Sequence, residues 1–137
     1  MLKDIIKDRD IDFSSNRINV NQLGEYENHM GVIFGEQVSN YITEYGYLGY
    51  EFIEFYGINA AQGLDSDMVT TTKWLHSAFP QTKGLTAIED QGDGDYYLAD
   101  ENDNIYRLLD STGELTGTQL KFNDYVLERF KTVDGIE

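Results

Sequence analysis

The sequence predicts a single domain of the α+β class, in which a mostly antiparallel sheet of about five to six strands is covered by helices. Between residues 84 and 110, three apolar runs are separated by joints of Asp, Asn, Gly and Glu; the runs are Leu85–Ile88, Tyr96–Ala99 and Ile105–Leu109. Short runs of β-branched and aromatic residues broken in this way are typical of a meander of antiparallel strands. Apolar residues at helical spacing lie before and after the meander, which predicts helices packed on the sheet. The length of 137 residues suits one domain.

The amino-terminal residues divide into a lead-in segment and the start of the domain. Residues 1–18 mix charges densely and are predicted to form either a loose helix or a mobile stretch, whereas residues 19–137 form the domain itself. The first helix of the domain is predicted over about residues 20–30, with Asn19 or Asn21 as its cap. Gly31 is well placed to end it.

A second helix and a strand are predicted next. The helix over residues 34–45 has an apolar stripe, and Gly46 ends it. Residues 47–58 then predict one continuous strand, because aromatic and branched residues alternate along it. In that strand Phe52 and Tyr56 point one way, and Ile53 and Phe55 the other. A strand that is apolar on both faces is expected inside the sheet.

A loop and a third helix lead into the meander. Residues 59–67 are predicted to form the loop, and Asp65 or Ser66 to cap a helix over about residues 66–79. Pro80, the only proline, ends that helix.

After the meander the sequence predicts a turn, a strand and a final helix. The turn covers residues 111–113, the strand residues 116–120, and the helix residues 121–133, whose apolar residues recur at helical spacing. The core of the domain is predicted to include the following residues: Phe34, Val38, Ile42, Phe52, Ile53, Leu98, Ile105, Val126 and Phe130.

The charge of the chain excludes some partners and favours others. There are 25 acidic residues against 10 Lys and Arg, which gives a net charge of −15, and no Lys or Arg occurs from Ile18 to Thr72. Nucleic acid is not an expected partner, because its phosphates would be repelled. A field of this sign speeds encounter with a basic protein. The alternative is that the acidity only keeps the protein soluble.

The composition also bears on location. No apolar run is long enough for a membrane span, and no signal peptide opens the sequence, so a cytoplasmic protein without membrane contact is expected. The absence of cysteine excludes disulfides, a thiolate nucleophile and cysteine-based metal sites. The sequence does not predict an oligomeric state.

No motif in the sequence predicts catalysis, a cofactor or a metal. The acidic run from Asp90 to Asn104 resembles a calcium loop. If the loop is counted from Asp100, however, Ile105 stands where glycine is required and Ser111 where the bidentate glutamate belongs. His29 and His76 lie on predicted helices, without a two-histidine spacing. The chain is therefore predicted not to be an enzyme. The 25 acidic residues are numerous enough to include a pair of carboxylates for acid–base catalysis, but no pattern in the sequence identifies such a pair.

Five segments, in order, resemble motifs of the SUKH superfamily, specifically its Smi/Knr-type domain. They are Glu27–Val32, Phe34–Gly46, Tyr56–Ile58, Gly94–Tyr106 and Phe122–Val126, which together span about residues 20–133. Gly35 departs from the pattern, since the family usually has proline there, and Lys121 stands where the family usually has serine.

The resemblance implies a function and a fold. Bacterial members of the superfamily are immunity proteins, encoded beside polymorphic toxins, that bind and neutralise the effector domain of the toxin, frequently a nuclease or deaminase. Fungal members are regulatory scaffolds in cell-wall assembly. The resemblance therefore implies a non-enzymatic antitoxin for a basic effector, and a nuclease is the expected effector. The alternative is an intracellular scaffold that binds a peptide or protein.

The partner is expected to bind at acidic joints and the strand that they flank. The six predicted contact residues are Glu51, Glu54, Glu89, Asp90, Asp93 and Asp95. Each could equally be an ordinary solvated turn residue, because Asp and Glu are frequent in exposed turns.

Overall fold

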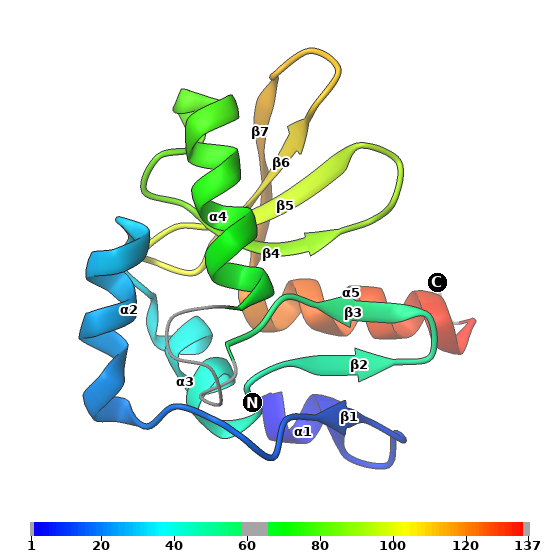
Figure 1. Cartoon of the computed structure of the whole chain (residues 1–137). Helices are drawn as coiled ribbons and strands as arrows, with labels where there is room; N and C mark the ends of the chain where they lie inside the picture. The colour runs from blue at the N-terminus through cyan, green and yellow to red at the C-terminus, as the bar shows by residue number, and fades with distance from the viewer. Residues whose placement is uncertain (1, 59–65, 136–137) are drawn as a thin grey trace.

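The computed structural model describes residues 2–58 and 66–135. Helices and strands are mixed along the chain, and the longest run of consecutive strands leads into the last helix (Figure 1). The helices are α1 (Leu2–Ile6), α2 (Leu23–Met30), α3 (Glu36–Glu44), α4 (Asp67–Ala78) and α5 (Phe122–Asp134). The strands are β1 (Asp12–Phe13), β2 (Leu48–Tyr50), β3 (Ile53–Phe55), β4 (Thr86–Asp90), β5 (Asp95–Ala99), β6 (Asn104–Leu109) and β7 (Leu115–Lys121). The α+β class is confirmed.

The strands form two antiparallel sheets, so the prediction of one sheet was wrong in this respect. One sheet has three strands in the order β1-β2-β3, and the other is the meander β4-β5-β6-β7. The sheets adjoin where the backbone N–H of Tyr56, just after β3, donates to the carbonyl of Ile88 in β4 at 2.8 Å.

The continuous strand predicted over residues 47–58 is instead a tight hairpin. β2 and β3 pair through Tyr50 and Ile53, and the two residues between them, Glu51 and Phe52, reverse the chain. Phe52 is therefore 75% exposed, and its predicted place in the core was wrong. The turn was missed because it has no glycine, asparagine or proline, which are the usual signals of a two-residue hairpin turn.

Helix α5 joins the two sheets. Its Tyr125 ring lies 5.1 Å from the Tyr97 ring of the four-stranded sheet and 6.3 Å from the Phe55 ring of the three-stranded sheet, measured between centroids. Phe130, which is fully buried, contacts Phe55 and Tyr50. In Figure 1, α5 lies behind β3. Its aromatic side chains make one continuous core of the two sheets.

Helix α4 covers the other face of the four-stranded sheet. Leu75 of α4 packs with Ala87, Leu98 and Leu108 of the sheet, and all four are buried. The meander is thus the middle layer between α4 and α5, whereas the three-stranded sheet has α5 on one face only (Figure 1). The remaining predicted core residues are buried: Phe34, Val38, Ile42, Ile53, Leu98, Ile105, Val126 and Phe130.

The departure at Gly35 has a structural reason. Asp103, which is buried, caps the start of α3, because its carboxylate accepts from the backbone N–H groups of Gln37 and Val38, each at 3.0 Å. A Cβ atom on Gly35 would overlap this carboxylate. Glycine therefore makes room for the cap, which ties the β5–β6 turn to α3.

The amino-terminal residues pack on the domain. α1 contacts α5, and Arg9 forms an ion pair with Asp134 of α5 at 2.7 Å. β1 pairs with β2. The predicted loop over residues 59–67 and the candidate cap Asp65 lie mostly outside the described residues, whereas Ser66 caps α4 by accepting from the N–H of Val69. Within residues 2–58 and 66–135, every helix is too short or too polar to cross a membrane.

Candidate partner-binding face

The outward face of the three-stranded sheet is open and acidic. Across its strands, Asp12 pairs with Gly49 and Gly49 with Glu54, so the three residues form one row. Residues paired in this way share a face of the sheet. Asp12 and Glu54 are exposed on either side of a glycine that has no side chain. The neighbouring row holds Leu48 and Phe55, which are buried against the core.

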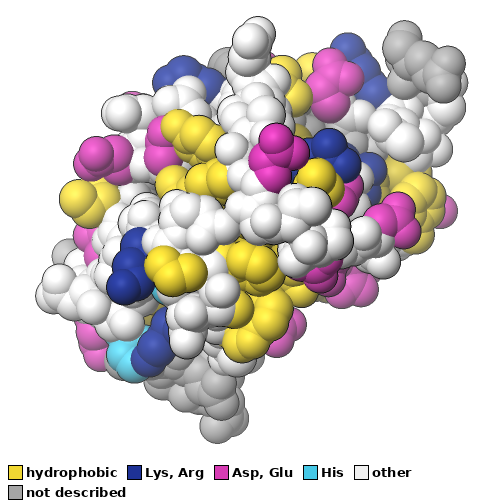
Figure 2. Space-filling model, turned by 90° about the horizontal axis from the view of Figure 1, so that it is seen from above, with side chains coloured by type: hydrophobic (Ala, Val, Ile, Leu, Met, Phe, Trp, Pro, Cys, Tyr) yellow, Lys and Arg dark blue, Asp and Glu magenta, His cyan; other side chains and the backbone are white. Residues whose placement is uncertain are grey.

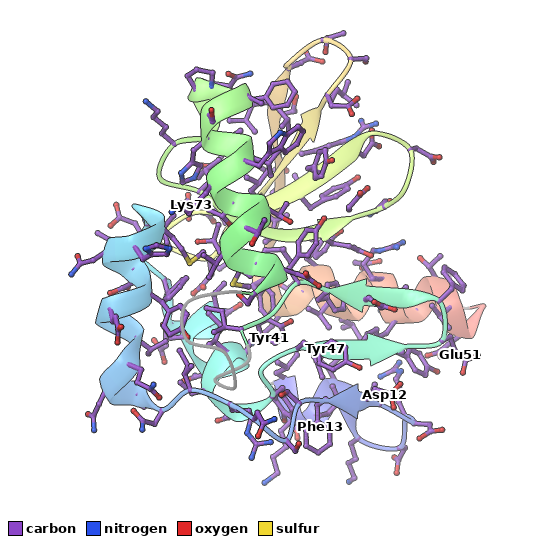
Figure 3. All side chains as sticks on the ribbon, in the orientation of Figure 1. Asp12, Phe13, Tyr41, Tyr47, Glu51 and Lys73 are labelled. Atoms are coloured by element: carbon purple, nitrogen blue, oxygen red, sulfur yellow. The ribbon has the colours of Figure 1, made fainter. Side chains whose placement is uncertain are left out.

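Tyr47 covers the bare backbone between these two carboxylates. A Cβ atom on Gly49 would lie 3.5 Å from the Tyr47 ring and 3.6 Å from Cβ of Asp12. Figure 3 shows Asp12 and Tyr47 on this sheet, with Glu51 at the tip of the hairpin. Burial raises the pKa of the Tyr47 hydroxyl, and the charges of Asp12 and Glu54 add to the rise. The hydroxyl therefore stays protonated and able to donate a hydrogen bond.

A cavity of about 410 Å³ continues this face toward α4. Tyr47, Glu54, Tyr56 and Asp67 line it, with polar groups from both the sheet and the helix. Burial raises the pKa of Tyr56 to about 12, and the charges of Asp90 and Asp67 contribute. The charges of Asp67 in α4 and Asp90 in β4 therefore both act on the Tyr56 hydroxyl.

Aromatic residues border the face on the side of α4. Trp74, which is half exposed, lies 6.0 Å from the Tyr96 ring and 6.1 Å from the Phe79 ring. Figure 2 views the molecule from above and shows hydrophobic side chains interspersed with acidic and basic ones. We call the set Asp12, Tyr47, Glu51, Glu54, Tyr56, Asp67 and Asp90 the acidic face. Exposed carboxylates around amphipathic tyrosines suit contact with a basic protein surface.

Three of the predicted contact residues belong to the acidic face. Glu54 is part of the central row, Glu51 lies at the hairpin tip, and Asp90 is exposed at the end of β4. Asp90 also accepts a hydrogen bond from the N–H of Gly92 at 2.7 Å, within the β4–β5 turn. Asp93 is exposed at the same turn.

The other two predicted contacts have partners within the chain. Asp95 of β5 forms an ion pair at 2.9 Å with Arg107 of β6, and Arg107 is itself exposed. Because a charge already paired in this way attracts less, Asp95 offers a basic partner less than Glu54 does.

Glu89 lies in the interior. Only 2% of its side chain is exposed, and Arg129 of α5 binds it in a bidentate arrangement, with N–O distances of 2.9 and 2.8 Å. The hydroxyl of Tyr125 also donates to it. The register shift between Ala87 and Glu89 accompanies this inward position. Glu89 thus joins β4 to α5 and does not face solvent.

Sequence reasoning did not find Asp12, Tyr47 and Asp67. Asp12 stands in the charge-balanced lead-in segment, and only its pairing with β2 brings it to this face. Tyr47 begins the strand predicted over residues 47–58, and Asp67 lies at the start of the helix predicted over about residues 66–79; neither is part of a motif. Tyr56 lines the cavity next to this face, whereas Tyr41 is fully buried in the core.

Nothing in the described residues forms a metal centre. No group of three or more His, Asp or Glu side chains in residues 2–58 and 66–135 is placed to hold an ion. In the stretch that resembled a calcium loop, Asp100 accepts from the N–H groups of Asn102 and Asn104 at 2.8 and 3.0 Å. These bonds account for the run as an Asp-stabilised turn.

Comparison with known families agrees with this architecture. A family model described as "SMI1-KNR4 cell-wall" (SUKH_5) matches residues 2–131, which is nearly the whole chain. The match includes α1 and β1 as well as the segments that carry the sequence resemblance. No curated protein gave a match. The chain therefore belongs to the SMI1-KNR4 family of the SUKH superfamily.

Proposed function

We propose that this protein is an immunity protein that binds the effector domain of a cognate toxin and neutralises it without catalysis. The observation that carries the proposal is the acidic face, an open sheet surface whose carboxylates are exposed, unlike the buried and paired Glu89. Family membership supports it, because SUKH domains include immunity proteins and are generally non-catalytic. The proposed site of action is the cytoplasm.

Physical chemistry supports a basic effector such as a nuclease. The enzyme groove that holds nucleic acid is cationic, and a protein of net charge −15 is attracted to it. The row formed by Asp12 and Glu54 offers carboxylates where a nucleic acid would offer phosphates. Exposed charges mainly accelerate association, so most of the affinity must come from buried contacts, for which tyrosines are favoured residues.

The description of the family model also favours a second candidate. Its words "cell-wall" point to a regulatory scaffold, which would use the same face for a protein that is not a toxin. A neighbouring gene that encodes a toxin-like domain would favour the immunity function over the scaffold.

The proposal is tested by titrating the purified effector domain from that neighbouring gene with this protein. Residual toxin activity should fall linearly and reach its minimum near one molecule per effector, without added metal or cofactor. Silencing of the effector by a hundredfold deficit of the protein would contradict the proposal, because it would require turnover. Unchanged toxin activity at a molar excess would contradict it as well.

A further inference from the structure

Phe52 is the most exposed of the large hydrophobic side chains in the described residues. It is 75% exposed, compared with 50% for Trp74. It occupies one of the two turn positions between β2 and β3, so its side chain projects from the end of a hairpin. A single exposed hydrophobic residue needs no special explanation. The backbone conformation of the turn is what distinguishes Phe52 from other exposed hydrophobic residues.

The first residue of the turn is one that does not favour its backbone conformation. Glu51 has a φ angle of 53°, in the left-handed region where Gly or Asn is usual and a glutamate is disfavoured. A Gly-containing turn would make the same hairpin with less strain and less exposed apolar surface. Strain of this kind is characteristic of functional sites, where a side chain is held in place for a partner.

The base of the hairpin is fixed to α5. The hydroxyl of Tyr50 donates to Asp134, and Arg9 binds the same carboxylate at 2.7 Å. The Tyr50 ring packs on the Phe130 ring at 4.9 Å, and the Arg9 guanidinium lies 5.9 Å from the Tyr50 ring centroid. The hydrogen bond from Tyr50, together with Arg9, lowers the pKa of Asp134. The tip is thus presented on a rigid base, which lowers the entropy lost when it binds.

We propose that Phe52 is the hydrophobic anchor of the partner interface and inserts into an apolar pocket bordered by Lys or Arg on the toxin effector. This inference rests on the proposed function and adds a hydrophobic contact at the hairpin end of the same surface. Glu51 and Glu54, both exposed, lie close to Phe52 in the sequence. Their negative charges favour a pocket on the effector whose rim carries Lys or Arg. A second copy of this chain is disfavoured as the occupant, because it would bring the same carboxylates face to face.

The experiment compares the affinity of the effector for Phe52→Ser with that for the matched control Ile33→Ser. Ile33 is 58% exposed and lies between α2 and α3, away from the hairpin. Loss of the anchor should weaken binding about 30-fold or more, whereas the control should stay within about threefold of the wild type. Equal affinity of Phe52→Ser and the wild type would overturn the anchor while leaving the immunity function intact. An effector that the wild-type protein does not bind would overturn both.

Two measurements without the effector complete the test. The melting temperature of Phe52→Ser should match that of the wild type, because the side chain has few partners to lose. A large fall would show that Phe52 serves the fold and would overturn the inference. The wild-type protein should also sediment as a monomer. A dimer that Phe52→Ser converts to monomer would assign Phe52 to self-association instead.

Discussion

The two sheets differ in how they use acidic residues. Glu89 of the four-stranded sheet and Glu54 of the three-stranded sheet are chemically identical, but α4 and α5 enclose the first sheet, whereas α5 covers only one face of the second. Glu89 is consequently buried and paired with Arg129, and Glu54 is exposed beside Gly49. The comparison shows that the cover on a sheet, and not the residue type, separates the buried, paired carboxylate of Glu89 from the exposed carboxylate of Glu54.

The largest effect is expected where the two sheets meet. Phe130→Ala removes a fully buried ring that contacts Tyr50 and Phe55, and should lower the free energy of unfolding by about 3–5 kcal/mol through lost burial and a cavity. Phe52→Ala, at the exposed tip, should stay within about 0.5 kcal/mol of the wild type. Urea unfolding of both variants checks this, and equal losses would contradict the division into core and tip.

The two glutamates provide the next comparison. Glu89→Gln leaves Arg129 without its charged partner in a largely buried setting, and should cost about 3 kcal/mol of stability. Glu54→Gln should change stability by less than about 0.5 kcal/mol, because its carboxylate is exposed. The measurement is the unfolding midpoint in urea at pH 7. A Glu89→Gln variant as stable as the wild type would show that the ion pair does not join β4 to α5.

Two glycines test how closely the backbone is packed around the acidic face. A Cβ atom on Gly57 would overlap the carbonyl oxygen of Gly46, so Gly57→Ala should cost about 1–3 kcal/mol or more. A Cβ atom on Gly49 meets only ordinary van der Waals contacts, so Gly49→Ala should be tolerated within about 0.5 kcal/mol. Thermal unfolding followed by circular dichroism distinguishes them. If Gly49→Ala were the worse variant, the description of the sheet surface would be wrong.

The smallest expected effect is a pH dependence at the base of the hairpin. The hydrogen bond from Tyr50 and the charge of Arg9 lower the pKa of Asp134, so its carboxylate stabilises the folded state above the unfolded-state pKa of about 4. This contribution is lost as the pH falls through the lower, folded-state pKa. The midpoint difference between wild type and Asp134→Asn should therefore shrink from pH 7 to pH 3. A difference that grows on acidification would contradict the assigned direction.

Much of the fold could be predicted from periodicity, and what was missed depends on tertiary contacts. The stripe on α5 and the joints of the meander were visible because helical spacing and Asp/Gly turns are local signals. The Glu51–Phe52 turn carries no such signal, so the hairpin and the division into two sheets were missed. For the same reason Phe52 was placed in the core.

The candidate face was harder to predict than the fold. Asp12 and Glu54 are far apart in the sequence, and only strand pairing through Gly49 brings them into one row. Glu89 was expected at the surface because its acidic neighbours suggest a joint, but Arg129, forty residues later, encloses it. Such pairings depend on distant residues and leave no pattern in the local sequence.

The central claim is that the partner binds at the acidic face, and association kinetics test it most directly. The effector should associate about tenfold more slowly with Asp12→Lys/Glu54→Lys than with the wild type at low salt, and the difference should shrink as salt screens the charges. Glu101→Lys, an exposed reversal in the β5–β6 turn, is the single-charge control and should have a smaller effect than Glu54→Lys alone. Equal slowing by Glu101→Lys and Glu54→Lys would mean that only net charge matters, and the acidic face would not be the binding site.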